Sequence, residues 1–350
     1  MSKIPLGFVG AGFMGQVVHI PNFLSVEGVK AVALAEARPR LAKLIADKYA
    51  IPKVWRTHRE LADDRSVDAV VAITHFDFNP EIAVDLLNAG KHVFIEKPMA
   101  LCSEAATQMV EAAEKNGRIL MVGYMKRYDT GVEIAKAKID DWLATGDVGD
   151  MTYVRSTNFG GDWICGPVFP SFTDEPIERV VTDRIPTYPD FIPENMRGEF
   201  SNFSNVYTHN VNLIRFLLGR ELTVRSAKVG SPMRVVTLDA GRVPVVMECG
   251  ELNSHEWHEE TVVYFRRGYV KVKTPSPLAR SVPASLQVYT WKEGAAELSC
   301  PVPPWDWAFR REAEVFVNCI REGRQPVSSG ADSANDVRLI EDIFRMALSE

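Results

Sequence analysis

The glycine-rich stretch at residues 10–15 restricts the possible folds of this chain more than any other feature. Gly10, Gly12 and Gly15 form a G-x-G-x-x-G pattern between an apolar run at 6–9 and a helical segment at 16–20. A strand, a tight turn and a helix in this order predict a dinucleotide-binding loop. The first glycine allows the turn, the second lets the backbone approach a pyrophosphate, and the third allows close helix packing. The amide groups and dipole at the helix start favour phosphate charge. The predicted phosphate-binding residues are Gly10, Gly12, Phe13, Met14 and Gly15.

An acidic residue follows the second predicted strand. This strand spans 29–35 and ends in Glu36, at the distance from the glycines where a carboxylate accepts hydrogen bonds from a ribose 2′-hydroxyl. Glu36 should repel a 2′-phosphate, so we expect NAD to be preferred to NADP. Arg38 weakens this expectation because its guanidinium could pair with such a phosphate, so NADP stays possible. The alternative for Glu36 is a solvated charge at a strand end.

Strands and helices alternate through the first third of the chain. Helical spacing at 39–49, 80–89 and 103–116 separates apolar strands near 67–74, 90–98 and 119–123. This alternation predicts a parallel sheet covered on both faces. A chain of 350 residues is too long for one typical core. We therefore expect a dinucleotide-binding domain at 1–124 and a substrate-binding and oligomerisation domain at 125–350, with helices at 305–322 and 333–348 bracing both.

The strand at 90–98 ends in Glu96, Lys97 and Pro98. It places a lysine at the carboxyl end of the parallel sheet, where ligands bind in open α/β folds. We expect Lys97 to contact a substrate; the alternative is a surface lysine that follows a strand. Thr74 ends the preceding strand in the same way.

The second part of the chain is mostly strand-like. Residues 222–300 alternate in polarity, with turn signals at 239–242 and 267–268. Short turns build an antiparallel sheet, and helices at 129–143 and 203–218 would cover one face and leave the other open as an oligomer interface. The segment 162–195 contains six prolines and reads as a long loop, either a lid over the substrate or a contact with a neighbouring subunit.

Together these motifs resemble the Gfo/Idh/MocA family, named after glucose–fructose oxidoreductase and inositol dehydrogenase. The resemblance rests on Gly10–Gly15, on Thr74 with the helix after it, on 90–98, on Gly123–Tyr128, and on His209 with the Leu-Gly pair at 218–219. It implies an α/β Rossmann domain followed by an α+β domain with a large open, mostly antiparallel sheet. It also implies an NAD(P)-dependent dehydrogenase or ketoreductase acting on CH-OH groups.

The resemblance also implies roles for single residues. Relatives pair the lysine of Glu-Lys-Pro with a D-x-x-x-H motif; His209 matches the histidine, while Asn205 stands in place of the aspartate. We expect neutral His209 to accept a hydroxyl proton and Lys97 to donate a hydrogen bond to the same oxygen. Asn205 and Asn212 would hold neighbouring hydroxyls. The alternative for His209 is a structural helix histidine. Further candidates are Tyr124, Arg127, Tyr153 and Trp163 for the substrate, and Thr74, Glu96 and Lys97 for the cofactor.

Composition excludes several other classes. The net charge of −6 argues against a nucleic-acid binder, and no apolar run is long enough to span a membrane. Five scattered cysteines without a C-x-x-C pair, and no signal-peptide pattern, predict a cytoplasmic protein without a metal site. The segment 255–260, rich in His and Glu, is expected to be a solvated edge.

The leading hypothesis is therefore oxidation of a secondary hydroxyl, or reduction of a ketone, in a sugar, sugar derivative or inositol by a homodimer or homotetramer. One alternative is a redox-neutral enzyme that oxidises a sugar transiently with tightly held NAD before an elimination or hydrolysis. Another is a dinucleotide-binding sensor without catalysis.

Overall fold

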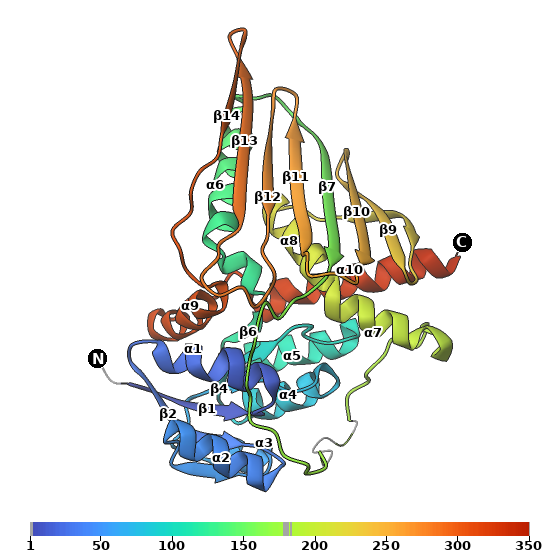
Figure 1. The fold of residues 1–350 in the computed structure, drawn as a ribbon. Helices are drawn as coiled ribbons and strands as arrows, with labels where there is room; N and C mark the ends of the chain where they lie inside the picture. The colour runs from blue at the N-terminus through green and yellow to red at the C-terminus, as the bar shows by residue number, and fades with distance from the viewer. Residues whose placement is uncertain (1–2, 178–181, 183, 350) are drawn as a thin grey trace. The chain divides into compact units, whose positions relative to one another are not determined.

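The computed structural model describes residues 3–177, 182 and 184–349, and the chain divides into two compact units (Figure 1). The first unit contains Met1–Tyr124, Val168–Pro189 and Phe309–Val337. The second contains Met125–Pro167, Asp190–Ala308 and Arg338–Glu350. The first unit thus includes two segments from beyond residue 124, one from the proline-rich loop and one from the C-terminal region.

The first unit contains the predicted Rossmann sheet. Its six strands are all parallel and follow the order β3-β2-β1-β4-β5-β6. The strands are β1 (Ile4–Val9), β2 (Val29–Ala35), β3 (Lys53–Trp55), β4 (Ala69–Ala72), β5 (His92–Glu96) and β6 (Leu120–Gly123). The helices of this part are α1 (Ile20–Ser25), α2 (Pro39–Tyr49), α3 (His58–Asp63), α4 (Asn79–Asn88) and α5 (Ser103–Lys115). Strand order reverses between β1 and β4, and the crevice at such a switch point is where dinucleotides bind.

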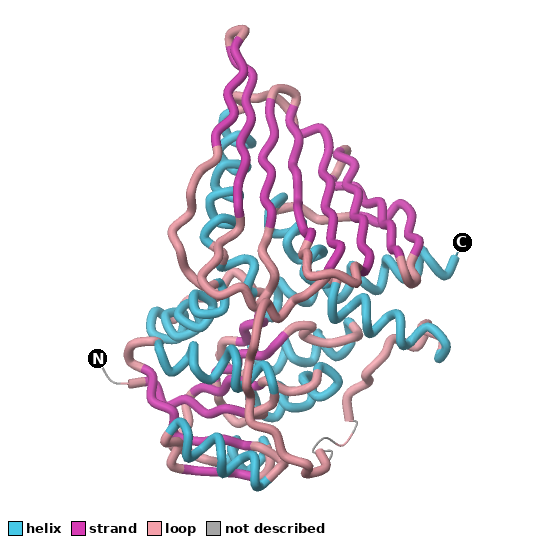
Figure 2. Tube along the Cα trace, in the orientation of Figure 1, coloured by secondary structure: helices cyan, strands magenta, loops and turns pink. Residues whose placement is uncertain are grey.

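The second unit is built on an eight-stranded sheet, drawn in magenta in Figure 2. The order is β14-β13-β12-β11-β7-β10-β9-β8, and every neighbouring pair is antiparallel except β7 with β10. The strands are β7 (Met151–Gly160), β8 (Thr223–Lys228), β9 (Met233–Ala240), β10 (Val243–Glu251), β11 (His258–Phe265), β12 (Gly268–Lys273), β13 (Ser285–Lys292) and β14 (Ala295–Ser299). The predicted large, mostly antiparallel sheet is confirmed.

Helices cover one face of this sheet. They include α6 (Thr130–Thr145), α7 (Arg197–Val206) and α8 (Thr208–Leu218). Asn158 on β7 donates from Nδ2 to Oδ1 of Asn210 on α8 at 2.8 Å, so this face of β7 packs on α8. Successive strand residues alternate between the two faces of a sheet. The other face of β7 therefore carries Tyr153, on the side away from α8.

The open face carries a row of four tyrosines, one on each of four neighbouring strands. Ring centroids lie 6.0 Å apart for Tyr153 and Tyr264, 5.9 Å for Tyr264 and Tyr269, and 5.4 Å for Tyr269 and Tyr289. All four side chains are partly exposed. Cross-strand aromatic pairs stabilise a sheet, and this row also leaves a continuous aromatic surface.

Two expectations from the sequence need correction. The helix predicted at 203–218 is divided at Tyr207 into α7 and α8, so Asn205 and His209 lie on different helices. The acidic segment at 255–260 is not solvated throughout, because Glu259 is fully buried.

The last helices are α9 (Ala308–Glu322) and α10 (Gly330–Ser349). Among the described helices, none is both long and apolar enough to cross a membrane.

Candidate functional site

The glycine loop after β1 has the shape that a pyrophosphate needs. Gly10 has φ +87°, and a Cβ there would lie 2.3 Å from the carbonyl oxygen of Ile73, so only glycine fits. A Cβ on Gly15 would lie 3.2 Å from the Gly10 carbonyl oxygen. A Cβ on Gly12 would meet no atom within 4 Å, so the backbone faces open space there. The loop therefore fits the predicted cofactor, with Phe13 and Met14 between the glycines.

Glu36 connects the end of β2 to this loop. Its Oε2 accepts a hydrogen bond from the Ala11 amide at 2.8 Å, and its side chain is almost wholly buried. Arg38 donates to the same carboxylate from Nε at 2.7 Å and from Nη2 at 3.1 Å. A solvated strand-end charge is thus the wrong interpretation of Glu36. The pair places a carboxylate beside the glycine loop, as a ribose hydroxyl requires.

Thr74, Glu96 and Lys97 lie at neighbouring strand ends and are connected through Asn79. Thr74 Oγ1 donates to Asn79 Oδ1 at 3.1 Å, and Asn79 Nδ2 donates to the carbonyl oxygens of Glu96 at 2.9 Å and Pro98 at 3.1 Å. The Lys97 amide donates to Glu96 Oε2 at 3.0 Å. Asn79 thus holds the turn that carries Lys97. Sequence reasoning missed it, although it begins the helix directly after the β4 end.

Part of the proline-rich loop packs on the same unit (Figure 1). We call residues 168–177 the strap. Gln16 Nε2 donates to the Ser171 carbonyl at 3.0 Å, and the Ser171 amide returns a hydrogen bond to Gln16 Oε1 at 2.7 Å. Gln16 Nε2 also donates to the Ala11 carbonyl in the glycine loop at 2.8 Å. Through Gln16, the strap is therefore joined to the phosphate-binding loop.

The other end of the strap binds the start of α2. Glu175 accepts hydrogen bonds from the Arg40 amide at 2.9 Å and the Leu41 amide at 3.2 Å. Arg40 also pairs with Asp174. Because α2 begins directly after Arg38, the strap lies next to the residues predicted to hold the ribose. Glu175 was not predicted, and its sequence neighbourhood carries no signal for this role.

In the second unit, the structure brings together two predicted substrate-binding residues. Arg127 Nε donates to Asn212 Oδ1 at 2.7 Å, and both side chains are buried. The guanidinium of Arg127 also lies 5.3 Å from the Phe216 ring centroid, in a cation–π contact. His209 shares α8 with Asn212 and is partly exposed, whereas Asn205 is on α7. These residues place hydrogen-bonding groups around α8.

The other three substrate candidates have surroundings different from those of Arg127 and Asn212. Tyr124 belongs to the hydrophobic core of the first unit. Tyr153 lies in the tyrosine row on the open sheet face. The Trp163 side chain is exposed, and the Trp163 carbonyl accepts a hydrogen bond from the Leu278 amide at 3.1 Å. Among these candidates, the structure therefore groups only Arg127 with Asn212 and α8.

A buried polar network in the second unit was missed from the sequence. Lys126 forms an ion pair with Glu259, and both are buried. Glu259 also accepts hydrogen bonds from Asn210 Nδ2 at 3.4 Å and Trp257 Nε1 at 3.1 Å. The local sequence around Lys126 does not distinguish it from an ordinary surface lysine. Its partner is set by the pairing of distant strands and helices.

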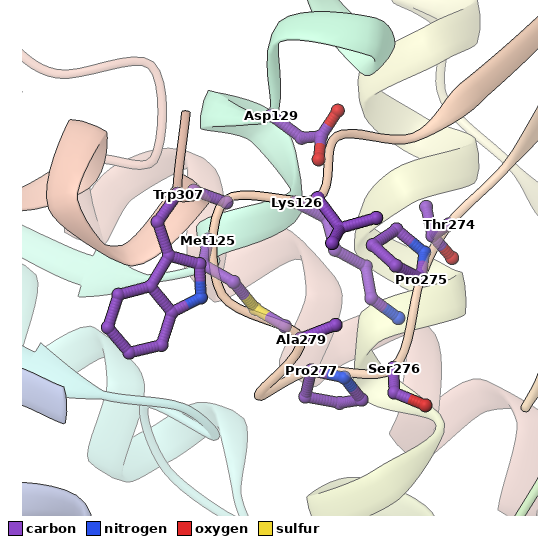
Figure 3. Close-up of a pocket in the computed structure, with 11 residues that line it drawn as sticks. Met125, Lys126, Asp129, Thr274, Pro275, Ser276, Pro277, Ala279 and Trp307 are labelled. Atoms are coloured by element: carbon purple, nitrogen blue, oxygen red, sulfur yellow. The ribbon is translucent and has the colours of Figure 1, made fainter. Parts of the chain in front are cut away.

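Lys126 also lines a pocket with an empty volume of about 330 Å³. Figure 3 shows Trp307 and Met125 on one side and Lys126 with the 274–279 loop on the other. Asp129 at the pocket edge is engaged, because its Oδ1 accepts hydrogen bonds from the amides of Gly131 at 2.8 Å and Ala284 at 3.0 Å. Lys126 and Asp129, the two charged residues named in this lining, thus both make contacts that stabilise the fold.

Known proteins resemble this chain over different lengths. Residues 4–124 match the model of an oxidoreductase family described by its NAD-binding Rossmann fold. Inositol 2-dehydrogenase from Salmonella paratyphi B is 32% identical over 161 residues, which cover 45% of this chain and 46% of that protein. The matched region thus spans about half the length of this relative.

Solved structures resemble the chain over almost its whole length. Aldose-aldose oxidoreductase from Caulobacter crescentus, crystallised with glycerol, has a TM-score of 0.76 at 21% identity, covering 99% of this chain and 98% of that one. A levoglucosan dehydrogenase in complex with NADH and levoglucosan has a TM-score of 0.76 at 19% identity, with the same coverage. At these identities the likeness concerns the fold. The match over residues 4–124 shows an NAD-binding Rossmann domain of this oxidoreductase family, and the solved structures share the two-sheet fold of the chain.

Proposed function

We propose that this protein is an NAD(P)-dependent oxidoreductase that transfers a hydride between nicotinamide and a secondary hydroxyl or ketone. The observation that carries this proposal is the joint placement of the open glycine loop, the Glu36 carboxylate and the Lys97 turn at the strand ends of one sheet. The substrate class is a sugar, a sugar derivative or an inositol. The named activity of the Salmonella relative supports this class.

NAD is the favoured cofactor, and it would supply the hydride acceptor in the oxidative direction. Residues 10–15 would hold its pyrophosphate, and Glu36 would accept hydrogen bonds from the ribose hydroxyls. Arg38 is already bonded to Glu36, so a 2′-phosphate would have to compete with that carboxylate. Both facts favour NAD over NADP.

The chain's own residues would handle the proton and the developing charge. Neutral His209 would accept the hydroxyl proton, a general-base role that an imidazole can fill. Lys97 would donate a hydrogen bond to the same oxygen and stabilise its negative charge as it develops. Asn205 and Asn212 would orient neighbouring hydroxyls, and Arg127 would hold Asn212 in place. In the reductive direction, the same groups would polarise a carbonyl and return the proton.

The strap favours a second candidate function. It joins the glycine loop to the start of α2 through Gln16, Ser171 and Glu175, so a bound dinucleotide would lie against it. A cofactor held in this way would leave slowly, which suits a redox-neutral enzyme that oxidises a sugar transiently and then returns the hydride. A non-catalytic sensor is disfavoured because Lys97 and His209 are both present.

Self-association through the open sheet face completes the proposal. The tyrosine row of residues 153, 264, 269 and 289 is a continuous, partly exposed aromatic surface, which suits pairing with a second copy as a homodimer or homotetramer. A cytoplasmic location agrees with the five cysteines, which form no disulfide among the described residues and three of which are buried.

The proposed function is tested by incubating the purified protein with NAD or NADP and a panel of inositols, aldoses and their keto derivatives. The formation or loss of reduced nicotinamide is followed by absorbance. We expect turnover of at least one polyol with NAD preferred. Cofactor that co-purifies and cycles without net reduction would support the redox-neutral candidate. Absence of both turnover and dinucleotide binding would overturn the proposal.

A further inference from the structure

Glu312 is a buried acid with no evident function in the proposed reaction. It lies on α9 in the first unit, and its side chain is fully buried. Within the part of the chain that the structure describes, neither of its carboxylate oxygens has a hydrogen-bond partner. An ionised carboxylate in such a place would destabilise the fold strongly unless a positive group or a donor compensated it. Glu312 therefore has to be neutral or to bind something.

The polar neighbours of Glu312 are His19 and Glu96, and Glu96 directly precedes Lys97 in the chain. His19, Glu96 and Glu312 each offer a side-chain atom within 4.8 Å of the other two, and all three are buried. His19 Nε2 lies 2.6 Å from Glu96 Oε1, while Glu96 Oε2 accepts the Lys97 amide at 3.0 Å. Both oxygens of Glu96 are thus engaged, one by His19 and the other by the residue proposed to act on substrate.

Aromatic side chains enclose this group. The His19 ring centroid lies 5.4 Å from that of Phe94 and 5.8 Å from that of Phe309. Phe23 and Phe316 extend the wall, each with contacts to Phe94. The surroundings are therefore apolar, and the charged groups that face Glu312 from the packed elements are Glu96 on β5 and His19 before α1.

Two carboxylates in a dry environment cannot both ionise without a compensating charge. Both oxygens of Glu96 already have partners in His19 and the Lys97 amide, whereas the described residues offer none to the oxygens of Glu312. Burial, together with the charge of Glu96, raises the pKa of Glu312 well above its usual range. The proton is therefore expected on Glu312.

A bound metal ion is the other way in which the negative charges of Glu96 and Glu312 could be compensated. The three ligand atoms of a zinc ion lie about 2 Å from the metal and therefore about 3.3 Å from each other. His19 Nε2 and Glu96 Oε1 are closer than that, at a distance that a shared proton explains. The geometry favours a proton over a metal ion in this cluster.

We propose that Glu312 is a permanently protonated carboxylic acid beside Glu96, so that His19, Glu96 and Glu312 form a buried triad that positions Lys97. We call these three residues the buried triad. The role of Lys97 in this inference rests on the proposed function, whereas the protonation of Glu312 does not. His19 and Glu312 are thus positioning residues that act through the Glu96 carboxylate.

Glu312→Gln is the diagnostic change because an amide has the shape and the donor capacity of a protonated acid. We expect this variant to keep kcat within about threefold of wild type. Glu312→Leu removes the neutral polar group beside Glu96, and it should lower kcat roughly tenfold to a hundredfold through misplacement of Lys97, with KM for the polyol little changed. Glu314→Gln, on the exposed side of the same helix, is the matched control and should match wild type.

Infrared spectroscopy detects the proton on the Glu312 carboxyl group independently of any activity measurement. The wild-type protein should show the C=O stretch of a protonated carboxylic acid between about pH 5 and pH 9, and Glu312→Gln should lack that band. Loss of turnover in Glu312→Gln, or the absence of the band, would overturn the proposal. So would a stoichiometric metal in the purified protein that this variant loses. If instead the band is present and Lys97→Ala keeps full turnover, the triad stands and the proposed function fails.

Discussion

Arg38 and Glu36 form a bidentate ion pair beside the glycine loop, with Nε to Oε1 at 2.7 Å and Nη2 to Oε2 at 3.1 Å. The same carboxylate accepts the Ala11 amide. The arginine that could have recognised a 2′-phosphate is therefore engaged by the acid that we propose accepts the ribose hydroxyls. We propose that discrimination between the two dinucleotides depends on this pair and not on either residue alone.

Replacing Glu36 with alanine should shift cofactor preference toward NADP. The change frees Arg38 for a 2′-phosphate and removes the acceptor for the ribose hydroxyls, so the ratio of kcat/KM for NADP to that for NAD should rise by at least about tenfold. Steady-state kinetics with both cofactors measures the ratio. Asp47→Ala, on the exposed side of α2, is the control, and an unchanged ratio in Glu36→Ala would contradict this account of the pair.

Loosening the strap should speed cofactor release. Glu175→Ala removes the acceptor for the first amides of α2, a capping contact of about 1 kcal/mol. We expect NADH to dissociate roughly fivefold faster from this variant, measured by stopped-flow fluorescence. The neighbouring Asp174→Ala is a matched control, because its ion pair with Arg40 is exposed and contributes little. Equal release rates for both variants and wild type would show that the strap does not retain the cofactor.

Acid should weaken the contacts that hold residues 182 and 184. Glu81 accepts the Thr182 amide at 2.9 Å, and Asp85 accepts Arg184 Nη2 at 2.6 Å. Burial acts to raise the pKa of Asp85, but hydrogen bonds from His58 and Arg184 outweigh it and hold the pKa below its usual value. The pKa of Glu81 is lowered in the same way, with Thr182 and Arg184 as donors that outweigh burial.

A lowered pKa in the folded state means that these acids stabilise the fold above their unfolded pKa of about 4. That contribution is lost as the pH falls through the folded-state values. The free energy of unfolding of wild type should therefore drop more steeply below about pH 4 than that of Asp85→Asn. Urea titrations across this range test it, with Asp141→Asn, at an exposed helix position, as the control. Parallel curves for wild type and Asp85→Asn would rule out this linkage.

Local patterns explain why much of the first unit could be predicted. The G-x-G-x-x-G loop, the acid after β2 and the Glu-Lys-Pro turn each depend on residues close in sequence, and the structure places them at strand ends as expected. The strand at 29–35 and the helix at 39–49 follow from hydrophobic periodicity for the same reason, whereas β3 and α3 were not predicted.

The missed features depend on contacts between distant residues. Glu312 reaches Glu96 only because α9 packs on β5, and Glu175 reaches α2 only because the strap crosses to it. The division at Tyr207 interrupts a periodicity that would suit one helix. Tyr207 there packs its ring against Arg234, with 5.0 Å between guanidinium and ring centroid. The sequence around Tyr207 does not predict its contact with Arg234, because tertiary packing can override the local preference for one continuous helix.

Breaking the ion pair between Lys126 and Glu259 should destabilise the second unit strongly. Both side chains are buried, so Glu259→Gln leaves a lysine charge uncompensated and should cost about 3–5 kcal/mol in the free energy of unfolding. The double change Lys126→Met with Glu259→Gln should cost less than the sum of the single changes. Lys271→Met removes the partly exposed neighbouring pair with Glu260, and its cost should stay below about 1 kcal/mol. A cost for Glu259→Gln as small as this control would contradict the buried pair's importance.

We propose that Lys97 and His209 both serve the hydride-transfer reaction. It is tested most directly by measuring kcat/KM and NAD affinity for Lys97→Ala and His209→Ala on the substrate found in the polyol screen. We predict a loss of about 10²–10⁴-fold in kcat/KM for each variant, with the NAD affinity of His209→Ala in a fluorescence titration within about threefold of wild type. Full turnover in both variants would contradict the account.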